Sequence, residues 1–324
     1  MYQMIIEKTF YFPLKMAQYL IGSFAVSDKR ILSRLQNFFP TYTSMWYEVR
    51  NQFNRLIGNP AIYKLQTVHI EPTNACNLKC LHCTPQNLTG VKRGLMDFSL
   101  FKNIVDQLTD LRVVILSWNG EPFLHPRLFD MCRYLKDKNI YVIIYTNGTF
   151  LTENNIKQVL SSGIPEIDVS ADGLEKIYEK NRGFDYNIFK NNLLNLLELR
   201  KRLGSPIRVL LTVTNAPNTE SYKRKIIDEW GNKVDYIHFA HLMGEKSRPR
   251  KKLCKTLFRH AAISWDGKIC PCVVDMQQTM LFGEITKDLN IMDIINSPKA
   301  KQYRLNHRKR KFEDICKYCD DFYG

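Results

Sequence analysis

Long hydrophobic runs are missing from this sequence. No uninterrupted apolar stretch is long enough to cross a lipid bilayer, which takes about 20 apolar residues in a helix. No internal repeat or low-complexity tract is visible either. The first residues do not resemble a cleavable secretory signal, because Glu7, Lys8, Pro13 and Lys15 interrupt the apolar residues there. These absences favour a globular protein in the cytoplasm.

Acidic residues are scarce relative to basic ones. The 324 residues include 47 Lys and Arg against 32 Asp and Glu, a formal net charge of +15. Much of the excess lies between Lys246 and Lys311, and it indicates either an anionic partner or a solvated basic face. With 44% hydrophobic residues, the chain has enough material for one large α/β domain and a smaller one.

The nine cysteines are the strongest signal, because cysteine-rich intracellular chains use them for metals or catalysis. Three follow a short apolar run in Glu-Pro-Thr-Asn-Ala-Cys-Asn-Leu-Lys-Cys-Leu-His-Cys, with the spacing C-x3-C-x2-C. A cubane iron–sulfur cluster takes one thiolate on each of its four irons. Cys76, Cys80 and Cys83 would therefore leave one iron open for chemistry. A zinc site completed by His82 or His69 is the alternative.

Short β-rich runs alternate with amphipathic helical patterns between about Leu65 and Gly244. The predicted strands are Gln66–Ile70, Val113–Ser117, Tyr141–Tyr145, Glu166–Ser170, Ile207–Val213 and Asp235–Ala240. The predicted helices are Ser99–Thr109, Arg127–Lys138, Glu153–Ser162, Asn187–Leu203 and Thr219–Trp230. Asp97 and Thr152 are expected to cap two of them. This alternation predicts parallel β/α units with right-handed crossovers.

The triplet and the alternation together resemble the radical S-adenosylmethionine (SAM) superfamily. The resemblance implies a partial, TIM-like (β/α)6 barrel with its site at the carboxyl ends of the strands. It implies that the open iron chelates the amino and carboxylate groups of SAM. One electron, supplied by a flavodoxin or ferredoxin, would then cleave SAM to a 5′-deoxyadenosyl radical.

Turn segments after later strands resemble the family's cofactor-binding positions. Trp-Asn-Gly-Glu-Pro at 118–122 is similar to a Gly-Gly-Glu-Pro segment, which implies that Gly120 approaches SAM and that Glu121 receives its ammonium group. Asn119 replaces the first glycine of that pattern. The further implied contacts are Asn147, Ser170, Asp172, Arg182 and Thr212. Asn-Gly and Asp-Gly are common turn dipeptides, so their value lies in recurring at successive strand ends.

A second group of cysteines lies near the carboxyl terminus, around a predicted β-hairpin at Ile263–Cys270 with Asp-Gly at its turn. Four thiolates there suit either a zinc ribbon or a fully ligated cluster. The order resembles the family's SPASM/twitch extension with one auxiliary [4Fe–4S] cluster. That resemblance implies as ligands Cys254, Cys272, Cys316 and Cys319, with Cys270 as the alternative to Cys272. Cys132, on a predicted helix, is expected to be a buried core thiol.

These features divide the chain into a helical amino-terminal extension (1–64), the radical SAM barrel (65–245) and a small auxiliary-cluster domain of hairpin and helix (246–324). The extension is rich in aromatic residues. It is expected either to cap the barrel or to lie on a membrane surface, where a lipid-linked substrate would be met.

The leading hypothesis is a radical SAM oxidoreductase that dehydrogenates a small molecule, with the auxiliary cluster accepting an electron. Crosslinking or epimerisation of a peptide is the second enzymatic hypothesis. A zinc-containing nucleic-acid-binding protein is the alternative from another class, although we do not expect a nucleic-acid partner. The oxidation also needs a proton acceptor or an oriented charge near the substrate carbon. The candidates, none favoured over an ordinary surface or linker residue, are Arg248, Glu245, His241 and Asp275.

Overall fold

The computed structural model describes residues 51–319 except 52, 55–56, 84–91, 216–221, 242–248 and 287–288. The strands of the predicted barrel are β1 (Thr67–Ile70), β2 (Val113–Leu116), β3 (Tyr141–Thr146), β4 (Glu166–Ser170), β5 (Arg208–Asn215) and β6 (Tyr236–His241). They lie side by side in chain order, and each neighbouring pair is parallel. The predicted α/β class and all six predicted strands are confirmed.

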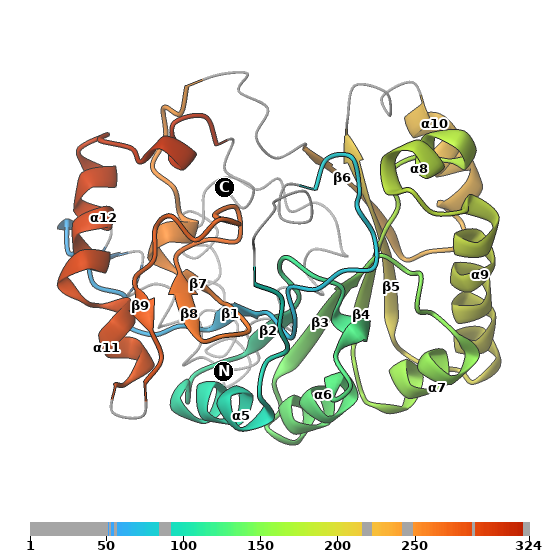
Figure 1. The fold of residues 1–324 in the computed structure, drawn as a ribbon, viewed down its shortest axis with the longest axis horizontal. Helices are drawn as coiled ribbons and strands as arrows, with labels where there is room; N and C mark the ends of the chain where they lie inside the picture. Colours follow the sequence, from blue (N-terminus) through green and yellow to red (C-terminus); the bar gives the residue numbers. More distant parts are fainter. Residues whose placement is uncertain are drawn as a thin grey trace, which may run out of the picture.

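Helices cover the outer side of the curved sheet (Figure 1). They are α5 (Phe98–Gln107), α6 (Leu128–Asp137), α7 (Glu153–Ser161), α8 (Glu175–Arg182), α9 (Tyr186–Arg202) and α10 (Lys223–Trp230). Both predicted caps are confirmed. The Asp97 carboxylate accepts from the main-chain N–H of Ser99, and the Thr152 hydroxyl accepts from that of Asn155.

Helix α8 is an addition to the predicted set. Only Tyr178 and Asn181 of its residues are buried, so the sequence shows almost no apolar periodicity there. Gly183 ends the helix at φ 67°, a left-handed conformation that favours glycine, and α9 begins three residues later. This break places the end of α8 over the cysteine loop, because Leu81 N donates to Asn181 O at 2.8 Å.

The hydrophobic core lies between the sheet and these helices. Strand residues such as Val68 and Leu116 pack there with helix residues such as Phe101, Met131 and Leu193, all fully buried. In β3 the buried residues alternate with half-buried ones, as expected where a strand turns one face to the core and the other to the barrel interior. Cys132 of α6 belongs to this core, which confirms its predicted burial.

The carboxyl-terminal part extends the same sheet. Strand β7 (His260–Ile263) pairs in parallel with β1, and β8 (Lys268–Cys270) and β9 (Gly283–Glu284) follow in antiparallel. The sheet order is β6-β5-β4-β3-β2-β1-β7-β8-β9, so the barrel is open and partial. The predicted hairpin is confirmed: Gly267, at φ 87°, donates its N–H to Ser264 O at 2.9 Å.

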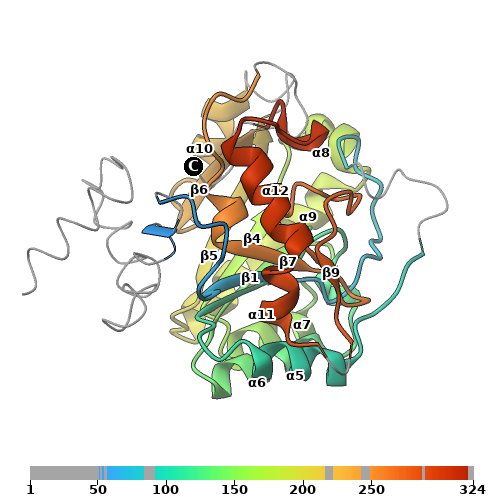
Figure 2. The same ribbon diagram turned by 90° about the vertical axis from the view of Figure 1, so that its left-hand side faces the viewer.

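Helices α11 (Ile291–Ile295) and α12 (Pro298–Arg308) pack beside this hairpin, as Figure 2 shows. Short 3₁₀ turns complete the described part of the chain at Pro122–Leu124 (η1), Thr256–Phe258 (η3) and Asp314–Cys316 (η4). The fully buried guanidinium of Arg304 ties the region together. It donates to the carbonyl oxygens of Leu257, Pro60 and Ile295 at 3.1, 3.0 and 2.8 Å.

Most of the predicted amino-terminal extension lies outside the described residues, so its role and the three domain boundaries stay predictions. The helical start predicted at Thr219 also lies outside them, and α10 begins at Lys223. Among the described helices, none has the length and apolar character needed to span a bilayer.

Candidate active site and auxiliary cluster site

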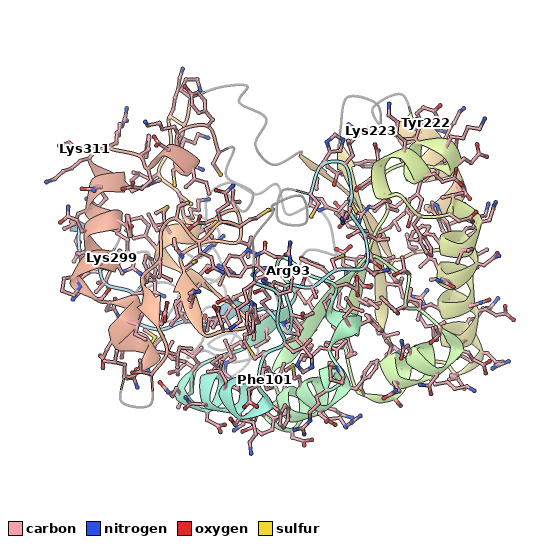
Figure 3. The ribbon with its side chains drawn as sticks, in the orientation of Figure 1. Arg93, Phe101, Tyr222, Lys223, Lys299 and Lys311 are labelled. Atoms are coloured by element: carbon pink, nitrogen blue, oxygen red, sulfur yellow. The ribbon has the colours of Figure 1, made fainter. Side chains whose placement is uncertain are left out.

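The cysteine loop follows β1 and folds back on residues 92–96. Thr73 Oγ1 donates to Gly94 O at 2.6 Å, and Asn74 exchanges hydrogen bonds with this segment, donating to Lys92 O and accepting from Gly94 N, both at 2.9 Å. Arg93, labelled near the centre of Figure 3, donates to Asn74 O at 2.9 Å. Side-chain hydrogen bonds of this kind fix the conformation of an irregular loop, which lacks the regular main-chain hydrogen bonds of a helix or sheet.

Cys76, Cys80 and Cys83 are half-buried and lie close enough to affect one another electrostatically. Burial raises the pKa of Cys76 to about 11, and repulsion by Glu121, Cys80 and Cys83 adds to the rise. Burial also raises the pKa of Cys80, against the opposing charge of Arg182. Thiols that resist ionisation, as those of Cys76 and Cys80 do, need a cationic partner to become thiolates, as an iron cluster would provide.

Two nitrogen donors point at these sulfurs. Asn147 Nδ2 lies 3.7 Å from Cys76 Sγ, and an Arg182 terminal nitrogen lies 3.9 Å from Cys80 Sγ. Hydrogen bonds to ligating sulfurs orient them and tune the metal. The predicted zinc alternative finds no support from His69, whose Nδ1 instead lies 2.7 Å from His260 Nε2 in the sheet.

Glu121 is a buried carboxylate at the carboxyl end of β2. It accepts from Thr146 Oγ1 at 2.8 Å, from Asn147 N at 2.7 Å and from Phe123 N at 3.2 Å. Burial raises its pKa to about 7, although these donors favour the ionised form. An ionised carboxylate offers about four acceptor positions. Glu121 therefore has capacity for one further donor, such as an ammonium group.

Gly120 is required by a close approach of backbones. A Cβ at this position would collide with the carbonyl oxygens of Thr73 and Ala75, and Glu121 N donates to Ala75 O at 2.8 Å. The glutamate loop is thus seated directly on the cysteine loop. Asn119, which departs from the family pattern, makes its own contacts: its N–H donates to Glu71 Oε1 at 3.0 Å and its side chain to Met276 O at 3.4 Å.

The remaining predicted contacts lie around the end of β4, with Thr212 inside β5, which continues to Asn215. Asp172 forms an ion pair of 2.7 Å with Arg182 and accepts from Thr214 N at 2.8 Å. Both of its carboxylate oxygens are therefore engaged in contacts within the protein. Thr212 donates to Asp168 at 2.9 Å and lies opposite half-buried Ser170 in the register. The predicted residues thus lie at the side of the sheet where the carboxyl ends of the strands meet. There, Asp172 positions Arg182 beside Cys80.

The auxiliary cysteines come from three separate segments. The electrostatic neighbours of the Cys272 thiol are Cys254, Cys319 and Cys316, whereas the first neighbours of Cys270 are Asp275, Glu71 and Asp266. This neighbourhood favours Cys272 over Cys270 as a ligand. Within the described residues, no group of three or more His, Cys, Asp or Glu side chains is placed to hold a single metal ion. The fit to a cluster is judged instead from the number of neighbouring thiols, which is four, one for each iron.

Hydrogen bonds shape the auxiliary site as well. Val274 N donates to Cys272 Sγ at 3.4 Å, and Cys254 N donates to His307 Nε2 at 2.9 Å. Burial raises the pKa of Cys316 to about 12, helped by the neighbouring thiols. These thiols, like the triplet, would become thiolates only on binding metal.

Sequence reasoning missed two residues of this region, Glu71 and Trp118. Glu71 is fully buried and accepts from the main-chain N–H groups of Asn119 and Trp265, in the hairpin turn, at 3.0 and 3.2 Å. Trp118 Nε1 donates to Val273 O at 2.8 Å. Glu71 is the first residue of the cysteine motif and Trp118 the first of the glutamate loop, so both stand in recognisable sequence segments. The sequence does not indicate their hydrogen-bond partners, which lie far away along the chain.

Comparison with known proteins agrees with this geometry. Residues 70–229 match the radical SAM superfamily, and residues 254–320 match an iron–sulfur cluster-binding domain, SPASM. An AdoMet-dependent heme synthase of Methanosarcina barkeri is 29% identical over 44% of this chain and 41% of its own length. The chain thus spans less than half of that relative.

Two further comparisons extend over most of the chain. The SAM-dependent 2-deoxy-scyllo-inosamine dehydrogenase of Niallia circulans is 24% identical over 78% of this chain and 92% of its own length. The crystal structure of BtrN in complex with AdoMet and 2-DOIA superposes with a TM-score of 0.56 at 23% identity, covering 79% of this chain and 93% of that one. The second comparison shows the shared fold. The chain belongs to the radical SAM superfamily, with SAM, a SAM-binding [4Fe–4S] cluster and an auxiliary iron–sulfur cluster of the SPASM type as its cofactors.

Proposed function

We propose that the chain catalyses a net two-electron dehydrogenation of a small hydroxylated molecule. The observation that carries this proposal is the second site, where Cys254, Cys316 and Cys319 are the thiol neighbours of Cys272, and Cys254 and Cys319 are also neighbours of Cys316. Four thiolates would fill all four corners of a cluster and leave no iron for substrate. Such a cluster suits electron transfer. The dehydrogenase named above, similar over most of both chains, supports the same reaction class.

The geometry supports the following proposed roles. Cys76, Cys80 and Cys83 hold the first cluster, and Glu121 receives the ammonium group of SAM beside it. Gly120, Asn147, Ser170 and Thr212 line the cofactor, and Asp172 orients Arg182 toward Cys80. The chemistry supplied there by the cluster and SAM is one-electron cleavage to a 5′-deoxyadenosyl radical. A flavodoxin or ferredoxin is the proposed reductant.

SAM would be the two-electron oxidant of the net reaction, since the one electron that enters to cleave it is matched by one electron that leaves the substrate. One hydrogen atom leaves a substrate carbon for the 5′-deoxyadenosyl radical, giving 5′-deoxyadenosine. The substrate radical would then give up one proton to a base and one electron, which a cluster held by Cys254, Cys272, Cys316 and Cys319 could accept, and a carbonyl group would result. The flavodoxin or ferredoxin that supplied the electron for SAM cleavage would take this electron back. Each turnover consumes one SAM and releases methionine.

Among the candidates for a proton acceptor or an oriented charge, Asp275 serves another purpose. Its carboxylate accepts from Thr279 N and Thr279 Oγ1, both at 2.8 Å, and from Met280 N at 2.7 Å, which folds the loop after Cys272. We therefore do not assign it as the base. Arg248, Glu245 and the His241 side chain lie outside the described residues.

Two cysteine variants test the proposal. Anaerobically reconstituted protein should hold about eight irons per chain, four for each cluster. Cys316→Ala should keep reductive SAM cleavage but lose net oxidation, whereas Cys80→Ala should lose cleavage itself. Cys132→Ala, at the buried core thiol, is the matched control and should keep both activities. The measurements are iron analysis, 5′-deoxyadenosine and oxidised product.

Other outcomes would overturn the proposal. Zinc at both sites, or no 5′-deoxyadenosine under reducing conditions, would contradict radical chemistry. Cleavage that is stimulated by a peptide and leaves a crosslink or an inverted residue would instead support peptide modification, our second hypothesis from sequence.

A further inference from the structure

The loop that carries Glu121 also reaches the auxiliary site. Trp118 Nε1 donates to Val273 O at 2.8 Å, and Val274 N donates to Cys272 Sγ at 3.4 Å. The carbonyl of Val273 and the N–H of Val274 belong to one peptide group. A continuous chain of two hydrogen bonds therefore runs from the indole, through this peptide, to a thiol of the auxiliary site.

Such a chain has an electronic consequence. A donor at the carbonyl oxygen polarises the peptide and makes its N–H a stronger donor, because hydrogen bonds in series reinforce one another. A stronger donor at a ligating sulfur stabilises the more negative, reduced cluster, and hydrogen bonds to sulfur are among the factors that set cluster potentials. We propose that Trp118 is a positioning residue that raises the reduction potential of the auxiliary cluster from within the SAM-binding loop. This inference rests on Cys272 as a ligand, as proposed above.

The surroundings of Trp118 hold it between the two sites. The next residue, Asn119, donates its N–H to Glu71 Oε1 and its side chain to Met276 O in the auxiliary loop. The other oxygen of Glu71 accepts from Trp265 N at 3.2 Å, at the tip of the β7–β8 hairpin. Buried Glu71 thus clamps the glutamate loop to the hairpin.

Coupling between the sites follows from this clamp. Glu121 lies three residues after Trp118, in a loop whose backbone is seated on Ala75 of the cysteine loop. A ligand that engages Glu121 is therefore expected to shift the indole relative to Val273. The reduction potential of the auxiliary cluster should accordingly differ between the SAM-bound and the SAM-free enzyme.

The test is a redox titration followed by electron paramagnetic resonance on the reconstituted full-length enzyme. Trp118→Phe keeps a ring but removes the donor, and the auxiliary cluster should shift to a more negative potential. The SAM-binding cluster should keep its potential. Trp265→Phe is the matched control, since that residue contacts Glu71 through its main chain and Gly94 through its ring. It should leave the auxiliary potential unchanged.

A second measurement uses the unsubstituted enzyme and therefore does not depend on how a variant folds. Addition of SAM to the unsubstituted enzyme should shift the auxiliary potential. In protein without clusters, the Val274 amide should also exchange with deuterium faster in Trp118→Phe than in Trp265→Phe.

Three results would count against the inference. Equal auxiliary potentials in Trp118→Phe and the unsubstituted enzyme, together with no response to SAM, would overturn it while leaving the proposed dehydrogenation intact. Retention of the auxiliary cluster in Cys272→Ser but not in Cys270→Ser would overturn it through the ligand assignment. A chain that binds no second cluster would contradict the proposed function as well.

Discussion

The two cysteine sites are built in different ways. The triplet comes from one loop of eight residues between Cys76 and Cys83, fixed by side-chain hydrogen bonds to residues a short distance along the chain. The auxiliary quartet draws on the segment before η3, the end of the hairpin and the chain around η4. Contacts within the carboxyl-terminal region join these segments, among them Arg250 N donating to Lys317 O at 2.7 Å and Cys254 N donating to His307 Nε2 at 2.9 Å. The first site should therefore depend on local geometry and the second on tertiary packing. Substitutions that affect one site and not the other test this difference.

The largest effect is expected at Gly120. A methyl group there would collide with the backbone at Thr73 and Ala75, so Gly120→Ala must displace the glutamate loop or the cysteine loop. Reductive SAM cleavage should be lost, while the auxiliary iron is retained. Iron analysis and 5′-deoxyadenosine formation measure the two outcomes.

Gly204→Ala is the matched control for Gly120→Ala. Its Cβ meets nothing within 4 Å, although its φ of +58° carries strain. This substitution should cost about 1 kcal/mol of stability without affecting cleavage. Full cleavage activity in Gly120→Ala would show that the local seating of the loops is dispensable.

The opposite selectivity is expected at Arg304. Arg304→Met removes the donors of three carbonyl groups, at Leu257, Pro60 and Ile295, and should destabilise the folded chain by about 3 kcal/mol. Burial lowers the pKa of Arg304 to about 9, which means that removing the charged guanidinium from water costs free energy that its hydrogen bonds must offset. Because its partners surround the auxiliary region, iron content should fall from about eight toward about four per chain.

The control for Arg304→Met is Arg133→Met, on the exposed side of α6, where the arginine pairs with Asp130. It should change stability by at most about 0.5 kcal/mol. Equal loss of iron from both sites in Arg304→Met would contradict a separate dependence of the auxiliary site on packing.

The same difference explains what the sequence could predict. The triplet spacing, the capping residues Asp97 and Thr152 and the Asp-Gly turn of the hairpin are local signals, and the structure bears out the caps and the turn. Helix α8 lacked apolar periodicity. The pairing of β7 with β1 was not predicted, because strand pairing across the chain leaves no local pattern in either strand.

The site residues divide in the same manner. Glu121 and Gly120 stood in a recognisable segment, whereas Glu71 could be seen only as the start of a motif. Its role depends on main-chain groups at Asn119 and Trp265, which carry no side-chain signature. The choice of Cys272 over Cys270 likewise came from a resemblance and gained its physical support from the neighbouring thiols.

A pH effect should report on the β1–β7 junction. His69 and His260 face each other there, and burial lowers the pKa of both, that of His260 to about 4. An unfolded histidine titrates near 6.5, so between about pH 6.5 and 4 the unfolded chain binds more protons. Stability from this pair is therefore complete above that window and is lost as the pH falls through it.

Urea unfolding of cluster-free protein across that pH range measures the slope. The double variant His69→Gln/His260→Gln should show a shallower fall on acidification. Glu71 and Glu121 act in the opposite sense, because burial raises the pKa of each to about 7 and their contribution declines as the pH rises from about 4.5. Parallel slopes for the unsubstituted chain and the double variant would mean that the histidine pair does not sense pH.

The smallest expected effects come from two matched helix caps, one in each region. Thr152 accepts from Asn155 N at 3.3 Å in the barrel, and Ser297 accepts from Ala300 N at 3.2 Å at the start of α12. Each change to alanine should cost about 1 kcal/mol of stability. Only α12 carries groups of the auxiliary region, namely Arg304 and His307, the latter an acceptor for Cys254 N. Ser297→Ala should therefore speed loss of auxiliary iron to a chelator, whereas Thr152→Ala, with the same loss of stability, should not. If the two variants lose iron at the same rate, overall stability and not the packing of α12 protects the auxiliary cluster.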